Sequence, residues 1–381
     1  MVGKKLVMLP GPTNIPNRVM HAMMKPIINH RGAEFKALYA EIMENLKCVF
    51  QTENDVFVLS ASGTGGVECA VSNLVGFGEK VIVPVFGVFG ERLAEKIRRR
   101  GGVPVELAVP WGEAPKTSEI RKAIENNSDV TAIFIVYNET STGVTVRELP
   151  QIGKIAKENN LLFVVDAVSI LGGDELLVDK WNIDVCVTGS QKCLACPPGL
   201  AMVSVSQKAW EKIEKTQGKP LYFDLLQMRE SAVKSETPFT PAIPLFYALD
   251  EALKMVLEER LEKRFERHRQ CAEAFYNATE AFEMTAFPKE KEARSNTVIA
   301  INVPKNVDEG AVREAMRNRY NVLIAGGMGK LKGKIFRVGC MGVVSQKEVL
   351  ATVNAFGKAL KEAGFPVDAE SGVEAAKKVF Q

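Results

Sequence analysis

The sequence predicts an α/β protein whose large domain has a mostly parallel sheet flanked by helices. Short apolar runs, glycine-rich turns and helical patterns follow one another through the first 205 residues, as in layered α/β folds. A chain of 381 residues, with 46% hydrophobic and 25% charged residues, can bury enough apolar surface for two domains. We therefore expect a smaller α+β domain to follow near the C-terminus.

The elements of the large domain are predicted in order along the chain. Residues 3–17 are rich in Gly, Pro and Asn and indicate an extended arm. Apolar residues on one helical face indicate a helix over 32–50. Apolar runs then indicate strands over 56–59, 81–85, 131–136, 161–165, 185–187 and 201–205, and helical patterns occupy 67–74, 91–100 and 150–159.

The composition changes near residues 215–245, where Thr237–Pro241 forms a Pro- and Thr-rich segment. A long charged helix is expected over 245–279. Beyond it, the patterns indicate strands over 296–302 and 335–338 and helices over 309–319 and 346–362. We therefore divide the chain into an N-terminal arm (1–15), a large domain (16–255) and a small domain (256–381).

The composition also argues against several classes of protein. The formal net charge is +3 without a long basic block, so nothing points to nucleic acid. No apolar run approaches the roughly 20 residues of a membrane span, and Pro10-Gly11-Pro12 comes too early for a secretory signal, so we expect a cytoplasmic protein. Seven scattered cysteines argue against a disulfide framework, and three histidines without metal-ligand spacing argue against a metal site.

Asp166 and Lys192 are the most informative pair in the sequence. Asp166 closes the apolar run 161–165, and Lys192 follows the run 185–187. Ligands of such sheets bind at the carboxyl ends of strands, so we expect both side chains in one site. A lysine that forms a Schiff base and an aspartate that keeps a pyridinium nitrogen protonated suit pyridoxal phosphate (PLP). The alternatives are a surface lysine and a helix N-cap aspartate.

A glycine-rich turn, Ser62-Gly63-Thr64-Gly65-Gly66, lies between a predicted strand and a predicted helix. Its backbone N–H groups and the helix N-terminus suit a phosphate. The turn fits neither G-x-x-x-x-G-K-[ST] nor G-x-G-x-x-G, which argues against a nucleotide-binding protein. A tight structural turn is the alternative.

Three more residues near strand ends suit an aromatic cofactor. Phe89 follows the strand over 81–85 and could stack on a flat ring, or it could be a core residue. Thr140 lies in the polar segment Glu139–Gly143, where a hydroxyl could bond the cofactor's phenolic oxygen, or the segment could be a simple turn. Gln191 directly precedes Lys192 and is either a cofactor contact or a turn residue.

Arg337 lies inside the apolar strand predicted over 335–338. An arginine in an apolar strand usually has an anionic partner, and its guanidinium fork matches a substrate carboxylate. A structural ion pair is the alternative. The Gly326–Lys330 segment lacks the Ser or Thr of a nucleotide loop, so we interpret it as a flexible loop near the substrate.

Together these motifs resemble the class V aminotransferases of PLP fold type I, and most closely the serine–pyruvate and alanine–glyoxylate aminotransferases. The resemblance runs from about residue 8 to 345. It is carried by Leu9–Thr13, Ser62–Gly66, Glu139–Gly143, Val165-Asp166, Gly189–Lys192, Pro197–Gly199 and Phe336–Gly339. The sequence departs from the family pattern at Phe89, where some members have tryptophan, at Cys193 and Cys196, and at Asn29-His30-Arg31.

The resemblance implies how the cofactor is held. Lys192 would bind it covalently and then move a proton between the substrate Cα and the cofactor. Asp166 would pair with the pyridine nitrogen. Thr64, Gly65 and Gly66 would hold the phosphate.

The resemblance also implies the remaining contacts and a homodimer with its sites at the interface. Phe89 would stack on the ring, Thr140 and Gln191 would flank the ring hydroxyl and the phosphate side, and Arg337 would bind the substrate α-carboxylate. The Thr237–Pro241 segment would reach the partner's phosphate pocket, with Thr240 as the favoured residue.

The expected reaction moves the amino group of serine or alanine to glyoxylate or pyruvate by a ping-pong mechanism. The alternative is a PLP-dependent cysteine desulfurase or lyase of the same fold. A desulfurase needs a mobile cysteine upstream of the arginine, whereas Cys340 follows Arg337 here. The remaining alternatives are a nucleotide-binding regulatory protein and a redox or zinc site at Cys193 and Cys196, for which no second ligand pair exists.

Overall fold

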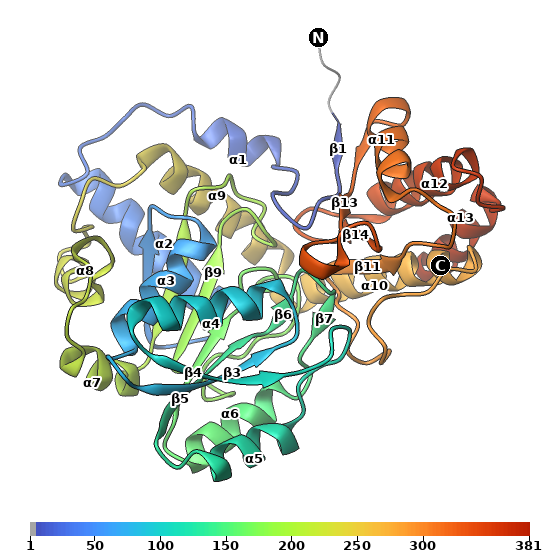
Figure 1. Ribbon diagram of the computed structural model, residues 1–381. Helices are drawn as coiled ribbons and strands as arrows, with labels where there is room; N and C mark the ends of the chain where they lie inside the picture. Colours follow the sequence, from blue (N-terminus) through green and yellow to red (C-terminus); the bar gives the residue numbers. More distant parts are fainter. Residues whose placement is uncertain (1–4) are drawn as a thin grey trace.

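A computed structural model describes residues 5–381 (Figure 1). Its central sheet consists of β2 (Asp55–Leu59), β3 (Lys80–Val85), β4 (Val103–Ala108), β5 (Val130–Val136), β8 (Leu162–Asp166), β9 (Val185–Gly189) and β10 (Ala201–Val205). The strand order is β2-β10-β9-β8-β5-β3-β4. β10 runs antiparallel to both neighbours, and all other pairs are parallel. The predicted α/β class with a mostly parallel sheet is confirmed.

Helices cover both faces of this sheet. In Figure 1, α3 and α4 lie on one side of β3, β4 and β5, and α5 and α6 lie on the other. The helices of this part are α1 (Asn17–Ala22), α2 (Ala33–Phe50), α3 (Gly63–Leu74), α4 (Val88–Arg100), α5 (Thr117–Asn126), α6 (Leu149–Glu158), α7 (Gln207–Lys215) and α8 (Leu225–Ala232). Among residues 5–381, no helix has both the length and the apolar character needed to cross a bilayer.

The glycine-rich turn expected before 67–74 is in fact the first turn of α3. Ser62 caps this helix, and its Oγ accepts the N–H of Gly65 at 3.4 Å. A Cβ on Gly66 would lie only 2.8 Å from Val187 Cγ1 and 2.9 Å from Ala201 Cβ. Gly66 is therefore needed for close packing of the helix on β9 and β10, and a sequence pattern cannot distinguish this use of glycine from a turn.

The single helix expected over 245–279 is wrong. Two helices occupy this stretch, α9 (Ile243–Glu259) and α10 (Leu261–Ala281), and Arg260 separates them with φ 69° and ψ 139°. Charged residues continue on both sides of the break, so the periodic pattern concealed it. The break lets the Glu259 carboxylate pair with both Arg264 and Arg267 of the second helix.

The C-terminal part has a hydrophobic core of its own. Its elements after α10 are β11 (Val298–Asn302), α11 (Glu309–Arg319), β12 (Val322–Leu323), β13 (Ala325–Gly326), β14 (Ile335–Gly339), α12 (Gln346–Glu362) and α13 (Ala369–Lys377). The predicted helices over 309–319 and 346–362 have these bounds. β11, β14 and β13 form an antiparallel sheet. The predicted small α+β domain therefore has its strands and helices, while the boundary at 255/256 stays a prediction.

The described part of the N-terminal arm is not merely extended. β1 (Leu6–Val7) pairs in parallel with β12. Met8 packs into the core of the C-terminal part. The arm therefore ties the two ends of the chain together, which a local sequence pattern cannot reveal; its residues 1–4 lie outside the described residues.

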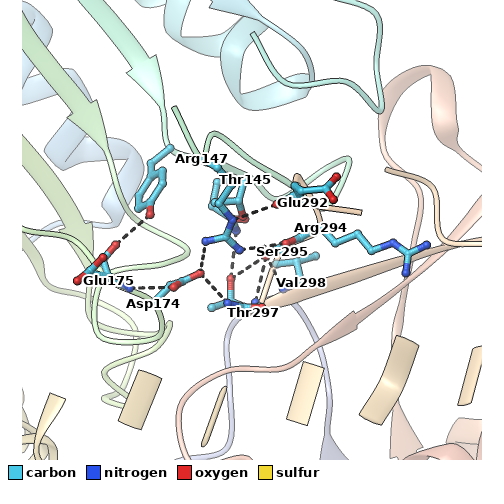
Figure 2. Close-up of polar contacts among 12 residues, drawn as sticks. Thr145, Arg147, Asp174, Glu175, Glu292, Arg294, Ser295, Thr297 and Val298 are labelled. Atoms are coloured by element: carbon cyan, nitrogen blue, oxygen red, sulfur yellow. Dashed lines mark hydrogen bonds and ion pairs between the residues drawn. The ribbon is translucent and has the colours of Figure 1, made fainter. Parts of the chain in front are cut away.

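A polar network joins the large domain to the segment that leads into β11 (Figure 2). Arg147 Nη1 lies 2.7 Å from Asp174 Oδ2, and the Asp174 side chain is only 12% exposed. Arg147 Nη2 also donates to the Arg294 carbonyl at 3.1 Å. Asn296 Nδ2 donates to the same Asp174 oxygen at 2.9 Å. One buried carboxylate therefore holds both sides of this junction.

Arg147→Ala should lower the free energy of unfolding by about 2–4 kcal/mol, because the Asp174 charge stays buried without its cation. Urea denaturation checks this value. Arg121→Ala is the matched control, since its 3.5 Å pair with Glu158 is exposed on both sides and should contribute less than about 1 kcal/mol. Equal, small losses in both variants would mean that the junction does not depend on this pair.

Candidate active site

One cavity of about 120 Å³ lies where the parallel strands end, and it collects most of the predicted site. The predicted residues on its wall are Thr64, Phe89, Thr140, Asp166, Gln191 and Lys192. They come from five separate segments of the chain. The carboxyl ends of parallel strands share one edge of the sheet, which explains why residues up to 128 positions apart meet here.

Lys192 follows β9 and lies under the N-terminal arm. Its Nζ donates to the carbonyl of Pro10. A Cβ on Gly11 would lie 2.4 Å from Lys192 Cδ, so only glycine leaves room for the lysine. Burial lowers the pKa of Lys192 to about 8, and the Arg337 charge acts in the same direction. A free amine is therefore available close to neutral pH, which is what a nucleophilic lysine needs.

Asp166 ends β8 and faces the same cavity. Its Oδ1 accepts the backbone N–H of Val168 at 3.0 Å. Burial raises the pKa of Asp166 to about 6, and the Glu139 charge adds to this, whereas the charges of Lys96 and Lys192 oppose it. The buried carboxylate therefore favours a cationic partner within the cavity.

The N-terminus of α3 contributes Gly63 and Thr64 to the cavity wall. Gly65 and Gly66, also predicted as phosphate ligands, do not line the cavity. The Gly66 N–H donates to the Ser62 carbonyl at 3.0 Å within the helix, so it is already used. The free N–H groups at the start of the helix are those that a phosphate would meet.

Arg92 and Lys96 are cavity residues that the sequence reasoning missed. They share one face of α4 with Phe89, at spacings of three and seven residues. The Arg92 guanidinium lies 5.2 Å from the centroid of the Phe89 ring. The helical spacing from Phe89 was the available signal, because residues at i+3 and i+7 point the same way.

Gln191 lies in the wall with its side-chain oxygen buried. Oε1 has no hydrogen-bond partner among the described residues. A buried acceptor without a donor is costly. Gln191 thus offers an acceptor to whatever occupies the cavity.

Arg337 lies beside the cavity on β14 and is 7% exposed. Nε donates to the Gly326 carbonyl at 2.7 Å, and Nη1 donates to the Thr140 carbonyl at 3.0 Å. No carboxylate of the described residues comes within 4 Å, so the structural ion pair considered from the sequence does not form. Burial lowers its pKa to about 10, while the charges of Glu139 and Glu309 act against this. A buried cation without an ion pair suits a carboxylate ligand.

Thr240 is exposed and lies in a different hollow, with Tyr222, Phe239 and Pro241 in its wall. The fold does not bring it to the Lys192 cavity of the same chain. Thr237, in the same segment, donates its hydroxyl to the Phe239 carbonyl at 2.7 Å.

The cysteines near the site are buried thiols. Cys193 and Cys196 are free and do not form a disulfide, and burial raises the pKa of the Cys193 thiol to about 12. Cys340 is 0% exposed, and burial raises its pKa as well. A protonated, buried thiol is a poor nucleophile, which disfavours the desulfurase alternative.

Comparison with known proteins agrees with this geometry. Residues 8–336 match the family described as aminotransferase class V. The chain is 45% identical over 379 residues to an uncharacterized aminotransferase of Methanocaldococcus jannaschii, covering 99% of this chain and 98% of that protein. It is 35% identical over 387 residues to the serine–glyoxylate aminotransferase of Methylorubrum extorquens, covering 98% and 95%.

A solved structure agrees as well. The crystal structure of ureidoglycine–glyoxylate aminotransferase from Bacillus subtilis superposes with a TM-score of 0.94 at 29% identity, covering 100% of this chain and 99% of that one. The fold and the family inferred from the motifs are thus confirmed. The chain belongs to the class V aminotransferases, which are pyridoxal-phosphate enzymes.

Proposed function

We propose that this aminotransferase moves the amino group of a small L-amino acid, serine or alanine, to glyoxylate or pyruvate by a ping-pong mechanism. The observation that carries the proposal is the shared cavity of Asp166 and Lys192, with Arg337 directly beside it. The names of two similar proteins, serine–glyoxylate and ureidoglycine–glyoxylate aminotransferase, support glyoxylate as an acceptor.

The residues of the cavity fit pyridoxal phosphate. The buried Asp166 carboxylate suits a protonated ring nitrogen, and the unpartnered Gln191 oxygen can accept from a bound molecule. Thr64 and the start of α3 would hold the phosphate, Phe89 would stack on the ring, and Thr140 would bond the ring hydroxyl. When bound, the cofactor withdraws electrons from the substrate Cα and so makes its proton removable.

Lys192 has two tasks in this proposal. It would hold the cofactor covalently before substrate arrives, and its amine would then act as the base that takes the proton from the substrate Cα and as the acid that returns it. The Pro10 carbonyl accepts a hydrogen bond from the amine, and Gly11 lies directly against the side chain, so both restrict its orientation. This confinement keeps the amine aligned for both tasks.

Arg337 would bind the α-carboxylate that donor and acceptor share. Its two bonds to the Gly326 and Thr140 carbonyls fix the plane of the guanidinium. The plane is therefore set before substrate binds, and one binding mode serves both halves of the ping-pong cycle.

Gly65 and Gly66 stay predictions as phosphate contacts.

We also propose a homodimer in which Thr240 completes the phosphate site of the partner. The surface around the Thr237–Pro241 segment supports contact with a second chain. Tyr222 and Phe239 stack at 5.4 Å with 47% and 37% of their surface exposed, and Leu221 is 68% exposed. Aromatic groups of this kind are enriched at protein interfaces.

A single-turnover spectral experiment tests the reaction. The PLP-loaded protein is mixed in turn with serine, alanine, aspartate, glutamate and cysteine, and then with glyoxylate or pyruvate. We expect serine or alanine to remove the visible absorbance of the lysine-bound cofactor, and the oxo acid to restore it. Release of sulfide from cysteine, without a reversible spectral change, would instead identify a desulfurase.

The rate of cofactor capture should depend on pH through Lys192. Its pKa is lowered to about 8 by burial, so the amine is protonated and unreactive below this pH and free above it. We expect the rate at which the apoprotein gains visible absorbance with PLP to rise through pH 8 and level off near pH 9. A rate that keeps rising beyond pH 10 would indicate an exposed, ordinary lysine.

A further inference from the structure

Glu139 is a buried acid beside the cavity whose carboxylate is bonded on both oxygens. It ends β6 (Asn138–Glu139) and is 0% exposed. Oε2 accepts the backbone N–H groups of Phe89 at 3.1 Å and Gly90 at 3.0 Å. Oε1 accepts the N–H of Ser141 at 3.0 Å and its hydroxyl at 2.5 Å. These bonds hold the side chain in one orientation.

The same bonds satisfy the start of α4. The first N–H groups of a helix have no partner inside it, and Gly87, before α4, has no side chain to cap them. Ser141 Oγ accepts the N–H of Val88 at 2.9 Å. A Cβ on Gly87 would lie 2.3 Å from Cγ and Cδ of Glu139. The glycine therefore leaves the space that the carboxylate occupies.

Glu139 thereby connects two walls of the cavity. One wall is Phe89, whose backbone it bonds. The other is Thr140, the next residue in the chain, whose carbonyl accepts Arg337 Nη1 at 3.0 Å. Glu139 is thus joined to Thr140 by a peptide bond and to Phe89 by a hydrogen bond.

We propose that Glu139 is a positioning residue that fixes Phe89 and Thr140 relative to each other across the cofactor site. The inference rests on the proposed function, in which these two residues contact the cofactor. Only a carboxylate fits, because both oxygens accept hydrogen bonds, whereas an amide would place its own N–H groups against backbone donors.

Glu139→Gln tests this role in the full-length protein. We expect the dissociation constant for PLP to rise about tenfold or more, because a buried donor loses its acceptor, and the visible circular dichroism of the bound cofactor to change. Glu309→Gln is the matched control. Glu309 is the other acid whose charge acts on Arg337, but its carboxylate pairs with Arg313 and not with α4, so PLP binding should stay as in the wild type.

A double-mutant cycle with Phe89→Ala separates positioning from a general loss of stability. If Glu139 acts through Phe89, adding Glu139→Gln to Phe89→Ala should weaken PLP binding by much less than it does alone. Full additivity, or a lower melting temperature of Glu139→Gln with unchanged PLP affinity and circular dichroism, would overturn the proposal.

Ser141→Ala provides the test if Glu139→Gln does not fold. It removes the hydroxyl bond to Oε1 and the acceptor of the Val88 N–H, and it leaves the bonds of Glu139 to Phe89 and Gly90 in place. We expect the same changes on a smaller scale, and unchanged PLP binding would overturn the proposal. If the wild-type protein binds PLP and the Glu139→Gln variant binds it equally well, this inference is refuted and the proposed function is not. Wild-type protein that binds no PLP refutes the proposed function as well.

Discussion

Lys192→Ala should abolish turnover and the visible absorbance of lysine-bound cofactor. The variant lacks both the amine that holds PLP and the group that moves the substrate proton, and proton transfer alone contributes about 10²–10⁴-fold to such reactions. The cavity should still bind PLP without a covalent bond, because Asp166 and Thr64 remain. Absorbance spectra, kcat and denaturing gel filtration of the PLP-treated protein check these expectations.

Lys96→Ala is the matched control for this prediction, since Lys96 is a second lysine on the wall of the same cavity. After borohydride reduction and then denaturation, the Lys96→Ala variant should still carry covalently bound cofactor. Turnover retained in Lys192→Ala would show that Lys192 is not the nucleophile. Loss of covalent cofactor in Lys96→Ala alone would show the same.

Arg337→Ala should lower kcat/KM for the amino donor and for the oxo acid together, because both carry an α-carboxylate. A hydrogen bond to a charged group contributes about 1.5–3 kcal/mol, so loss of a two-bond contact corresponds to roughly 10²–10⁴-fold in kcat/KM. Most of this change should appear in KM, as expected when an interaction binds substrate and transition state alike. Steady-state kinetics with each substrate varied in turn measure it.

Two further variants distinguish substrate binding from a structural role of Arg337. Arg337→Lys keeps the charge but loses the fork, so it should recover only part of the activity. Arg92→Ala removes the arginine that lies over Phe89 and should affect PLP binding more than KM. An unchanged KM in Arg337→Ala, together with a lower melting temperature, would show that the arginine only supports the Gly326 and Thr140 carbonyls.

The central sheet and the pair at its strand ends could be predicted because their signals are local. A buried parallel strand is a short apolar run, and Asp166 and Lys192 each follow such a run directly. The helices at 309–319 and 346–362 were predicted with their observed bounds because a helical pattern is also a local signal. The edge strand β4 escaped prediction because it is half exposed and contains Pro104 and Glu106.

The sequence by itself determined the fold class, the family and six of the residues that gather at the carboxyl edge of the sheet, but not Arg92 and Lys96. Only the tertiary structure decided how those residues are held. Arg337 donates a hydrogen bond to the carbonyl of Thr140, which lies 197 positions away in the chain. The Pro10 carbonyl accepts a hydrogen bond from Lys192. The chain breaks at Arg260 between α9 and α10. Periodic patterns report which face of an element is buried, but the partner across that face depends on the packing of distant segments, which no local pattern contains.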